Sequence, residues 1–302
     1  MKRKTVIKDY FSEKLIIKDL KKAGFFMDRI EYFDSYDNLR LYRHSFIPES
    51  DIKAIVVITH GIAEHCERYQ KFARKLVKNN FFVELSDLRG HGRSGGARCY
   101  IKSFEEYVKD LNTIISEVKK EFPHRKLFLF GHSMGAQIVG YYVIENEHNI
   151  NGLILSSAAY ELDSEINPVL KILAPVLGKL FPRLKTIKLD SNKISRSEES
   201  IKDYESDPFV FRKGIPVRTG AEINRITEYL QTRIHKIKQP ILILQGSSDK
   251  IVNPEGAQKI FQRITSEDKK LKIYEGFYHE LLHDPESDRV ESDIIHWLEE
   301  HC

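Results

Sequence analysis

Short apolar runs that alternate with helical stretches constrain the fold of this 302-residue chain more than any other feature. Ala54–Thr59, Leu127–Phe130 and Ile241–Leu244 show no polar alternation, which is typical of strands buried on both faces of a sheet. Further strand-like segments are Phe81–Leu85, Leu153–Leu155 and Leu271–Tyr274, and helical stretches lie at Tyr69–Lys78, Phe104–Glu121, Met134–Glu145, Pro254–Ile264 and Arg289–Glu300. The alternation predicts an α/β protein with a doubly wound, mostly parallel sheet.

The alternation stops near residue 158 and resumes near residue 238. Residues 159–237 are helical or irregular in pattern and rich in proline, serine and charge, so we predict a helical cap (lid) inserted over the sheet. The core then comprises residues 23–158 and 238–302, and it opens with a hairpin over Phe25–Phe33 and Leu39–Ile47. Residues 1–22 form a basic N-terminal extension.

The cap contains one long apolar segment, Pro168–Pro182, whose only charged residues are Lys171 and Lys179. Pro175 predicts either a second short helix or a kink within it. One face of the segment can pack on the body. The breadth of its apolar surface also favours an acyl channel and transient contact with a lipid surface.

Charge is unevenly placed along the chain. Residues 1–22 hold eight basic and three acidic side chains, whereas the whole chain has a net charge of +4, so the remainder is slightly acidic. The basic extension is either a solvated terminus or a weak contact for anionic membrane. Nucleic-acid binding is not indicated, because the rest of the chain has no basic surplus.

The cysteines and the start of the chain indicate a cytoplasmic setting. Cys66, Cys99 and Cys302 form neither a disulfide framework nor a metal-ligand spacing. No apolar run is long enough for a transmembrane helix, and charged residues interrupt any signal-like segment at the N-terminus.

Two segments match the pattern G-x-S-x-G, Gly131–Gly135 and Gly92–Gly96. Nucleophilic serines of this kind sit on a sharp turn between a strand and a helix, where flanking side chains would clash. Ser133 has the apolar strand before it and a helix-compatible run after it, whereas Ser94 lies in a loop rich in glycine and arginine. We therefore predict Ser133 as the nucleophile.

A serine hydroxyl needs a histidine as base and an acid that orients the histidine. In such folds the acid follows the serine along the chain, and the histidine follows the acid. His279 follows the strand Leu271–Tyr274, and His283 is its near rival, while the terminal-helix positions of His296 and His301 suit surface residues. Asp249 follows the strand Ile241–Leu244 through a short turn, and Asp163 is the main alternative; Asp190, Asp203 and Asp207 fall within the predicted cap. The predicted triad is Ser133, Asp249 and His279.

The oxyanion of a tetrahedral intermediate is usually held by two backbone N–H groups. One is expected from Met134, directly after the nucleophile. The other is expected from the loop His60–His65, where Gly61 allows close approach and Ile62 supplies the N–H group.

The chain resembles the monoacylglycerol lipase family of α/β-hydrolases, which includes bacterial and viral lysophospholipase-like enzymes. The resemblance runs from about residue 25 to the C-terminus and rests on HGIAEHCERY, DLRGHGRSGG, GHSMGAQ, YESDPF, ILILQGSSDKIV and LKIYEGFYHELLHD. It implies an α/β-hydrolase fold, the same triad and oxyanion hole, and a polar exit for glycerol lined by Glu64, Arg68, Tyr204 and His283. Glu64 and Arg68 could equally form a structural ion pair.

The chain departs from the family pattern at three places. Ile62 is bulkier than the usual small residue, the spacing from His279 to His283 differs by one, and residues 1–22 have no counterpart.

The predicted activity is hydrolysis of a monoacylglycerol to glycerol and a fatty acid through an acyl-enzyme, with no cofactor and no metal. The predicted partners are a small lipid ester and, transiently, a membrane surface touched by the cap and the basic extension. A lysophospholipase is the nearest alternative, since only a pocket for the phosphate head would distinguish it. An acyltransferase or thioesterase could use the same triad, and a non-catalytic binding protein of the same fold is a distant alternative.

Overall fold

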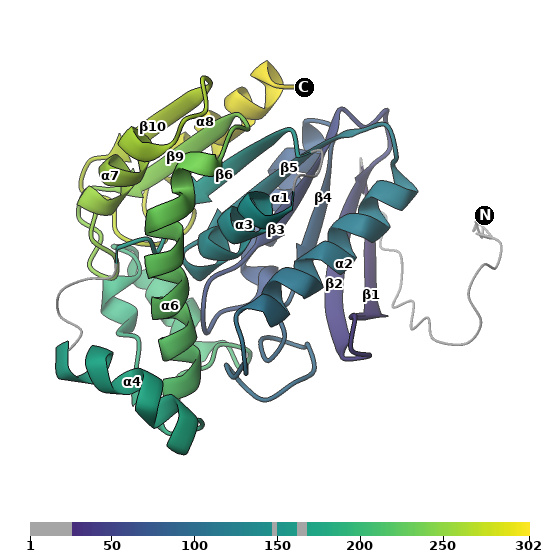
Figure 1. The fold of residues 1–302 in the computed structure, drawn as a ribbon. Coiled ribbons are helices and arrows are strands. Elements are labelled where there is room, and N and C mark those ends of the chain that lie inside the picture. Colours follow the sequence, from purple (N-terminus) through teal and green to yellow (C-terminus); the bar gives the residue numbers. More distant parts are fainter. Residues whose placement is uncertain (1–25, 147–149, 162–167) are drawn as a thin grey trace.

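The computed structural model describes residues 26–146, 150–161 and 168–302, with the side chains of 168–172 left out. The predicted basic extension and the alternative acid Asp163 lie outside the described residues. Figure 1 shows a central twisted sheet with helices on both faces and a helical region beside one end of the sheet.

The sheet contains eight described strands in the order β1-β2-β4-β3-β5-β6-β9-β10. The first two, β1 (Phe26–Asp34) and β2 (Arg40–Pro48), form the predicted hairpin, and β2 pairs antiparallel with β4. The other neighbours pair in parallel; they are β3 (Ala54–Thr59), β4 (Phe81–Ser86), β5 (Lys126–His132), β6 (Gly152–Ser156), β9 (Ile241–Gly246) and β10 (Lys269–Tyr274). The predicted mostly parallel sheet is confirmed.

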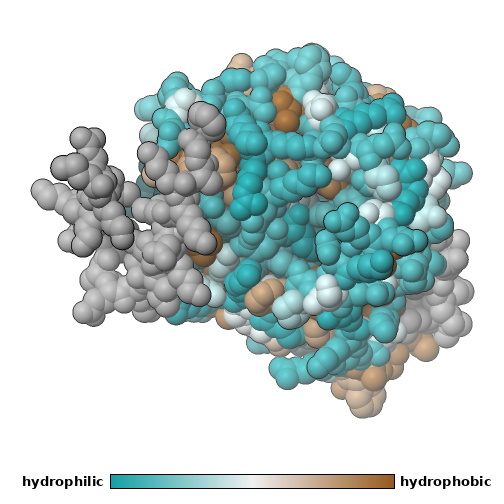
Figure 2. All heavy atoms as spheres, turned by 180° about the vertical axis from the view of Figure 1, so that it is seen from behind, coloured by the Kyte–Doolittle hydropathy of each residue, from teal (hydrophilic) through white to brown (hydrophobic). Residues whose placement is uncertain are grey.

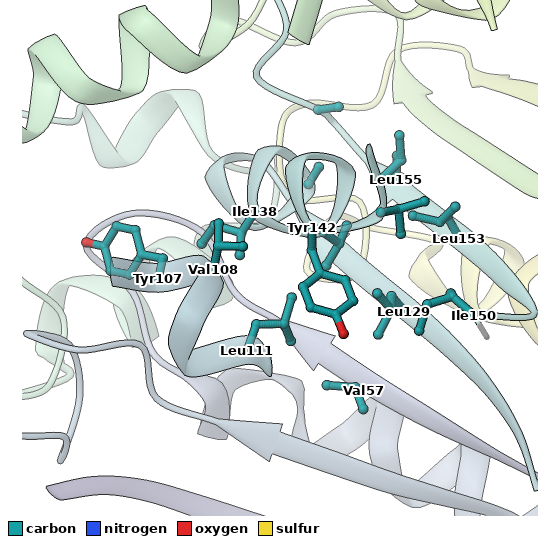
Figure 3. Close-up of a cluster of buried hydrophobic side chains, with 14 of the residues drawn as sticks. Val57, Tyr107, Val108, Leu111, Leu129, Ile138, Tyr142, Ile150, Leu153 and Leu155 are labelled. Atoms are coloured by element: carbon teal, nitrogen blue, oxygen red, sulfur yellow. The ribbon is translucent and has the colours of Figure 1, made fainter. Parts of the chain in front are cut away.

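Alternate residues of the central strands enter two separate cores. Ile55 and Val57 of β3 pack with α2 (Glu105–Glu121) and α3 (Met134–Glu145) on one face, in a cluster that α7 (Glu255–Arg263) also joins. Figure 3 shows the α2 and α3 part of this cluster over the strands. On the other face of the sheet, Val56 and Ile58 of β3 pack with α1 (Gln70–Lys78) and α8 (Ser287–Glu300). Each fully buried side chain of this size contributes about 1.5–3 kcal/mol to stability, so both cores hold the strand ends in place.

The region between β6 and β9 is largely helical, with α4 (Pro168–Leu180), α5 (Glu198–Ser206) and α6 (Val217–Arg233). It also holds a small antiparallel ribbon of β7 (Lys185–Ile187) and β8 (Ile215–Pro216), which the sequence did not predict. Ile226 and Leu230 of α6 enter the same core as α3. The cap boundaries at 159 and 237 stay a prediction.

Helix α4 lies at the outer end of this region, against α6 (Figure 1). It continues through Pro175, so of the two outcomes expected at this proline, the second short helix is wrong. Its solvent side and the residues after it expose Leu173, Val176, Leu180, Phe181 and Leu184. Figure 2 shows apolar surface gathered at this end of the molecule. No helix of the described ranges is long and apolar enough to span a membrane.

Candidate active site

Ser133 stands at the turn between β5 and α3 with φ 53° and ψ −116°, a strained conformation for a residue with a side chain. The turn is tight because both flanking glycines are closely packed. A Cβ atom at Gly131 would lie 2.5 Å from the carbonyl oxygen of Gly135, and one at Gly135 would lie 2.2 Å from that of Thr59. Both glycines of the motif are therefore required by the fold.

Ser94, the rival serine, is buried in a loop and held by backbone groups. Its hydroxyl donates to the carbonyl of Asp87 at 2.6 Å and accepts the N–H of Tyr42 at 2.9 Å. These bonds tie the loop to β2, which is a structural role.

His279 and Asp249 are joined by a hydrogen bond although 30 residues separate them: Nδ1–H of the imidazole donates to Oδ2 of the carboxylate at 2.8 Å. The same oxygen accepts Nε2–H of Gln245 at 3.0 Å, and Oδ1 accepts the N–H groups of Ile251 and Val252 at 2.8 and 3.1 Å. Four donors therefore orient this carboxylate.

The environments of both groups favour their charged forms. Burial raises the pKa of Asp249, but His279 and the two N–H donors outweigh it, so the pKa lies below its ordinary value. Burial lowers the pKa of His279, but the charge and hydrogen bond of Asp249 outweigh it, so this pKa is raised. The imidazolium that would form during proton transfer is thereby stabilised.

Hydrogen bonds at the strand ends connect the backbones of Ser133 and His279 through the neighbouring residues Ser156 and Ser157. The N–H of Ser133 donates to the carbonyl of Ser156 at 2.9 Å, and the hydroxyl of Ser157 donates to the carbonyl of His279 at 2.7 Å. The ring of His132, next to Ser133, lies 4.8 Å from the ring of His279, centroid to centroid. The other late histidines are elsewhere: His301 pairs with Asp268 and His296 with Glu300.

The loop after β3 runs directly beside Ser133. A Cβ atom at Gly61 would lie 3.3 Å from Cβ of Ser133. Within the described residues, neither the N–H of Ile62 nor that of Met134 has a hydrogen-bond acceptor, and the latter opens a helix. The two predicted oxyanion donors therefore have no competing acceptor among the described residues, and each is the neighbour of a residue that lies at or against Ser133.

Glu64 and Arg68 form the ion pair that the sequence allowed, and a third residue joins them. Arg68 donates from Nη1 to Glu64 at 2.8 Å and through both Nη atoms to the two carboxylate oxygens of Glu280 at 2.6 Å. Sequence reasoning missed Glu280. The signal available was a carboxylate directly after the predicted base, but nothing indicated its partner 212 residues away.

His283 and Tyr204 also contact Arg68, the first at its backbone and the second at its guanidinium group. Nε2–H of His283 donates to the carbonyl of Arg68 at 2.9 Å, and the Tyr204 ring lies 5.0 Å from the guanidinium carbon. His283 is therefore not bonded to Asp249. The head-group role that the resemblance implies for Glu64, Arg68, Tyr204 and His283 stays a prediction.

Comparison with known proteins places this site in a family. Residues 50–286 match the family described as Serine aminopeptidase, S33. The chain belongs to this family. A monoacylglycerol lipase of Mycolicibacterium smegmatis is 31% identical over 89% of this chain and 96% of its own length. The crystal structure of a monoacylglycerol lipase of Paleococcus ferrophilus superposes with a TM-score of 0.80 at 34% identity. The match covers 87% of this chain and 99% of the other. Phospholipase YtpA of Bacillus subtilis is 30% identical over 78% of this chain and 92% of its own length.

This S33 chain is therefore a monoacylglycerol lipase-like serine hydrolase with the α/β-hydrolase fold, as the motifs predicted. It is an enzyme, which sets aside the binding-protein alternative. In the described part of the chain, no cluster of His, Cys, Asp and Glu side chains is arranged to hold a metal ion.

Proposed function

We propose that the chain hydrolyses monoacylglycerol to glycerol and a fatty acid, with Ser133, Asp249 and His279 as its catalytic triad. The observation that carries this proposal is the buried hydrogen bond between His279 and Asp249 beside a serine on a strained turn. The names of the relatives described above support the substrate class.

In the proposed mechanism, Nε2 of His279 accepts the proton of the Ser133 hydroxyl while Oγ attacks the ester carbonyl. The N–H groups of Ile62 and Met134 stabilise the oxyanion. His279 then donates its proton to the leaving glycerol oxygen, which frees glycerol and leaves the acyl-enzyme. Water repeats the sequence, with His279 as base and then as acid, and releases the fatty acid.

Charge next to the nucleophile favours a neutral head group. Glu64 and Glu280 contribute two carboxylates to the single guanidinium of Arg68, and Glu64 borders the Gly61 backbone beside Ser133. A phosphodiester would meet an excess of negative charge here, which raises the cost of binding it. Hydrolysis of lysophospholipid is nevertheless the second candidate, because one similar protein is named a phospholipase.

We also propose that α4 and the residues after it contact lipid surfaces transiently. The exposed fractions of Val176, Leu180 and Phe181 are 55%, 67% and 61%, and the basic residues Lys179, Arg183 and Lys185 are close to them in the sequence. Apolar side chains bordered by cations suit the boundary of an anionic bilayer.

The test measures release of oleate from monooleoylglycerol and from lysophosphatidylcholine by the wild type, Ser133→Ala and the control Ser94→Ala. Loss of the nucleophile should lower the rate by about 10⁴–10⁶. Ser94→Ala keeps the triad and should retain measurable activity. Preference for the lysolipid would favour the second candidate, and an active Ser133→Ala would refute the assignment of the nucleophile.

A further inference from the structure

Glu64, Arg68 and Glu280 form a buried charge cluster that the triad chemistry leaves unexplained. The exposed fractions of their side chains are 4%, 8% and 5%. Burial of three charges is costly, and the cost is offset only where hydrogen bonding is extensive. The three residues come from the loop after β3, the adjoining 3₁₀ turn and the loop after β10.

The cluster joins two loops that the sheet does not place side by side. Strands β5, β6 and β9 lie between β3 and β10, so no ladder of strand hydrogen bonds sets the distance between the loops that follow them. The bidentate contact from Arg68 to Glu280 spans this gap. A contact of this kind fixes orientation as well as distance.

On the β3 side, the cluster reaches the backbone of the predicted oxyanion loop. Oε1 of Glu64 accepts the N–H of Gly61 at 2.7 Å and the hydroxyl of Tyr69 at 2.9 Å. Gly61 precedes Ile62, so the carboxylate determines how the next peptide group is presented beside Ser133. Arg68 in turn orients the carboxylate through its other oxygen.

On the β10 side, Glu280 is the residue directly after His279. Its own N–H donates to the carbonyl of Ile194 at 2.8 Å, so its backbone is fixed from the opposite direction. Four groups therefore hold the position of the imidazole: Asp249 on its Nδ1, Ser157 on its carbonyl, and Ile194 and Arg68 on the next residue.

The cluster also brings negative charge to the imidazole. Burial raises the pKa of both carboxyl groups, but Arg68 outweighs it, so Glu64 and Glu280 are ionised at neutral pH. The titratable and charged groups around His279 are Asp249 from the loop after β9, Glu280 on its own loop, Glu64 and Arg68 near β3, and His132 from β5. Burial lowers the pKa of His132 to about 4, so it is neutral.

We propose that Glu280 is a positioning residue for the proposed ester hydrolysis. Through Arg68 and Glu64 it sets the oxyanion loop relative to His279, and its charge stabilises the imidazolium formed during proton transfer. The inference rests on the proposed triad, and it assigns to Glu280 a role that is separate from binding of the head group.

Glu280→Gln tests the charge because the amide oxygen can still accept from Arg68. We expect kcat/KM to fall about 10–100-fold, and the acid limb of its pH profile to move downward by a few tenths of a unit to one unit. Arg68→Lys keeps the cationic charge and removes the bidentate contact, so its rate should fall without a comparable downward move of the acid limb.

The matched control is Glu291→Gln, which removes another buried carboxylate, on α8 and paired with Lys75. It should leave the acid limb in place. A Glu280→Gln enzyme with wild-type rate, or with a lower rate and an unmoved acid limb, would overturn the proposal. If that variant does not fold, Glu64→Gln provides the same test of the acid limb. An active Ser133→Ala enzyme would instead refute the triad itself.

Discussion

Oδ2 of Asp249 lies 2.8 Å from Nδ1 of His279 and also accepts a hydrogen bond from the side-chain amide of Gln245. An asparagine in place of Asp249 would keep the size of the side chain but would remove the charge that fixes the imidazole tautomer. We expect Asp249→Asn to lower kcat by about 10⁴ with little change in KM. Steady-state hydrolysis of monooleoylglycerol measures both.

The control for this prediction is Asp163→Asn, the alternative acid in the sequence. It should retain activity close to that of the wild type. The opposite result, an inactive Asp163 variant and an active Asp249 variant, would move the assignment to Asp163.

The pH dependence follows from the raised pKa of His279. Proton transfer needs the neutral imidazole, and Asp249 holds the folded-state pKa above 6.5, so activity should decline as pH falls through that raised value. The acid limb of kcat/KM reports this group in the free enzyme. A rate that stays level down to pH 5 would contradict the assignment of His279 as the base.

The tight turn at Ser133 predicts a large effect from a single methyl group. In Gly135→Ala the added Cβ would meet the backbone oxygen of Thr59, which cannot move without displacing β3. We expect a loss of about 3 kcal/mol in the free energy of unfolding and loss of activity. Denaturant titration and oleate release measure the two effects.

Gly220→Ala in α6 is the matched control, because a Cβ atom there meets nothing within 4 Å. It should be neutral or stabilise the protein by up to about 1 kcal/mol. Equal destabilisation by both substitutions would mean that close packing at Gly135 is not the cause.

The sheet and the closeness of Asp249 to His279 could be predicted from sequence because their signals are local. Apolar runs such as Ala54–Thr59 identify strands, and residues that follow parallel strands lie at one edge of the sheet, which is why Asp249 and His279 were expected to meet. The partner of Arg68 could not be found, because Glu280 lies 212 residues away and no periodic pattern links them. Ribbon β7–β8 was missed because strands of three and two residues are too short to show alternation.

If α4 contacts lipid, substitutions in it should weaken binding to a lipid surface and leave the hydrolysis of a soluble ester unchanged. Leu180→Ser and Phe181→Ser remove exposed apolar side chains at the end of α4 and directly after it, and Figure 1 shows α4 lying apart from the central sheet. Burying each in a bilayer would contribute about 1.5–3 kcal/mol, so the double variant should bind anionic vesicles at least tenfold more weakly. Cosedimentation measures this binding, and hydrolysis of a soluble short-chain ester should be unchanged. Ile273→Ser on β10, an exposed apolar residue elsewhere, should leave vesicle binding intact, and equal weakening by that variant would contradict a specific role for α4.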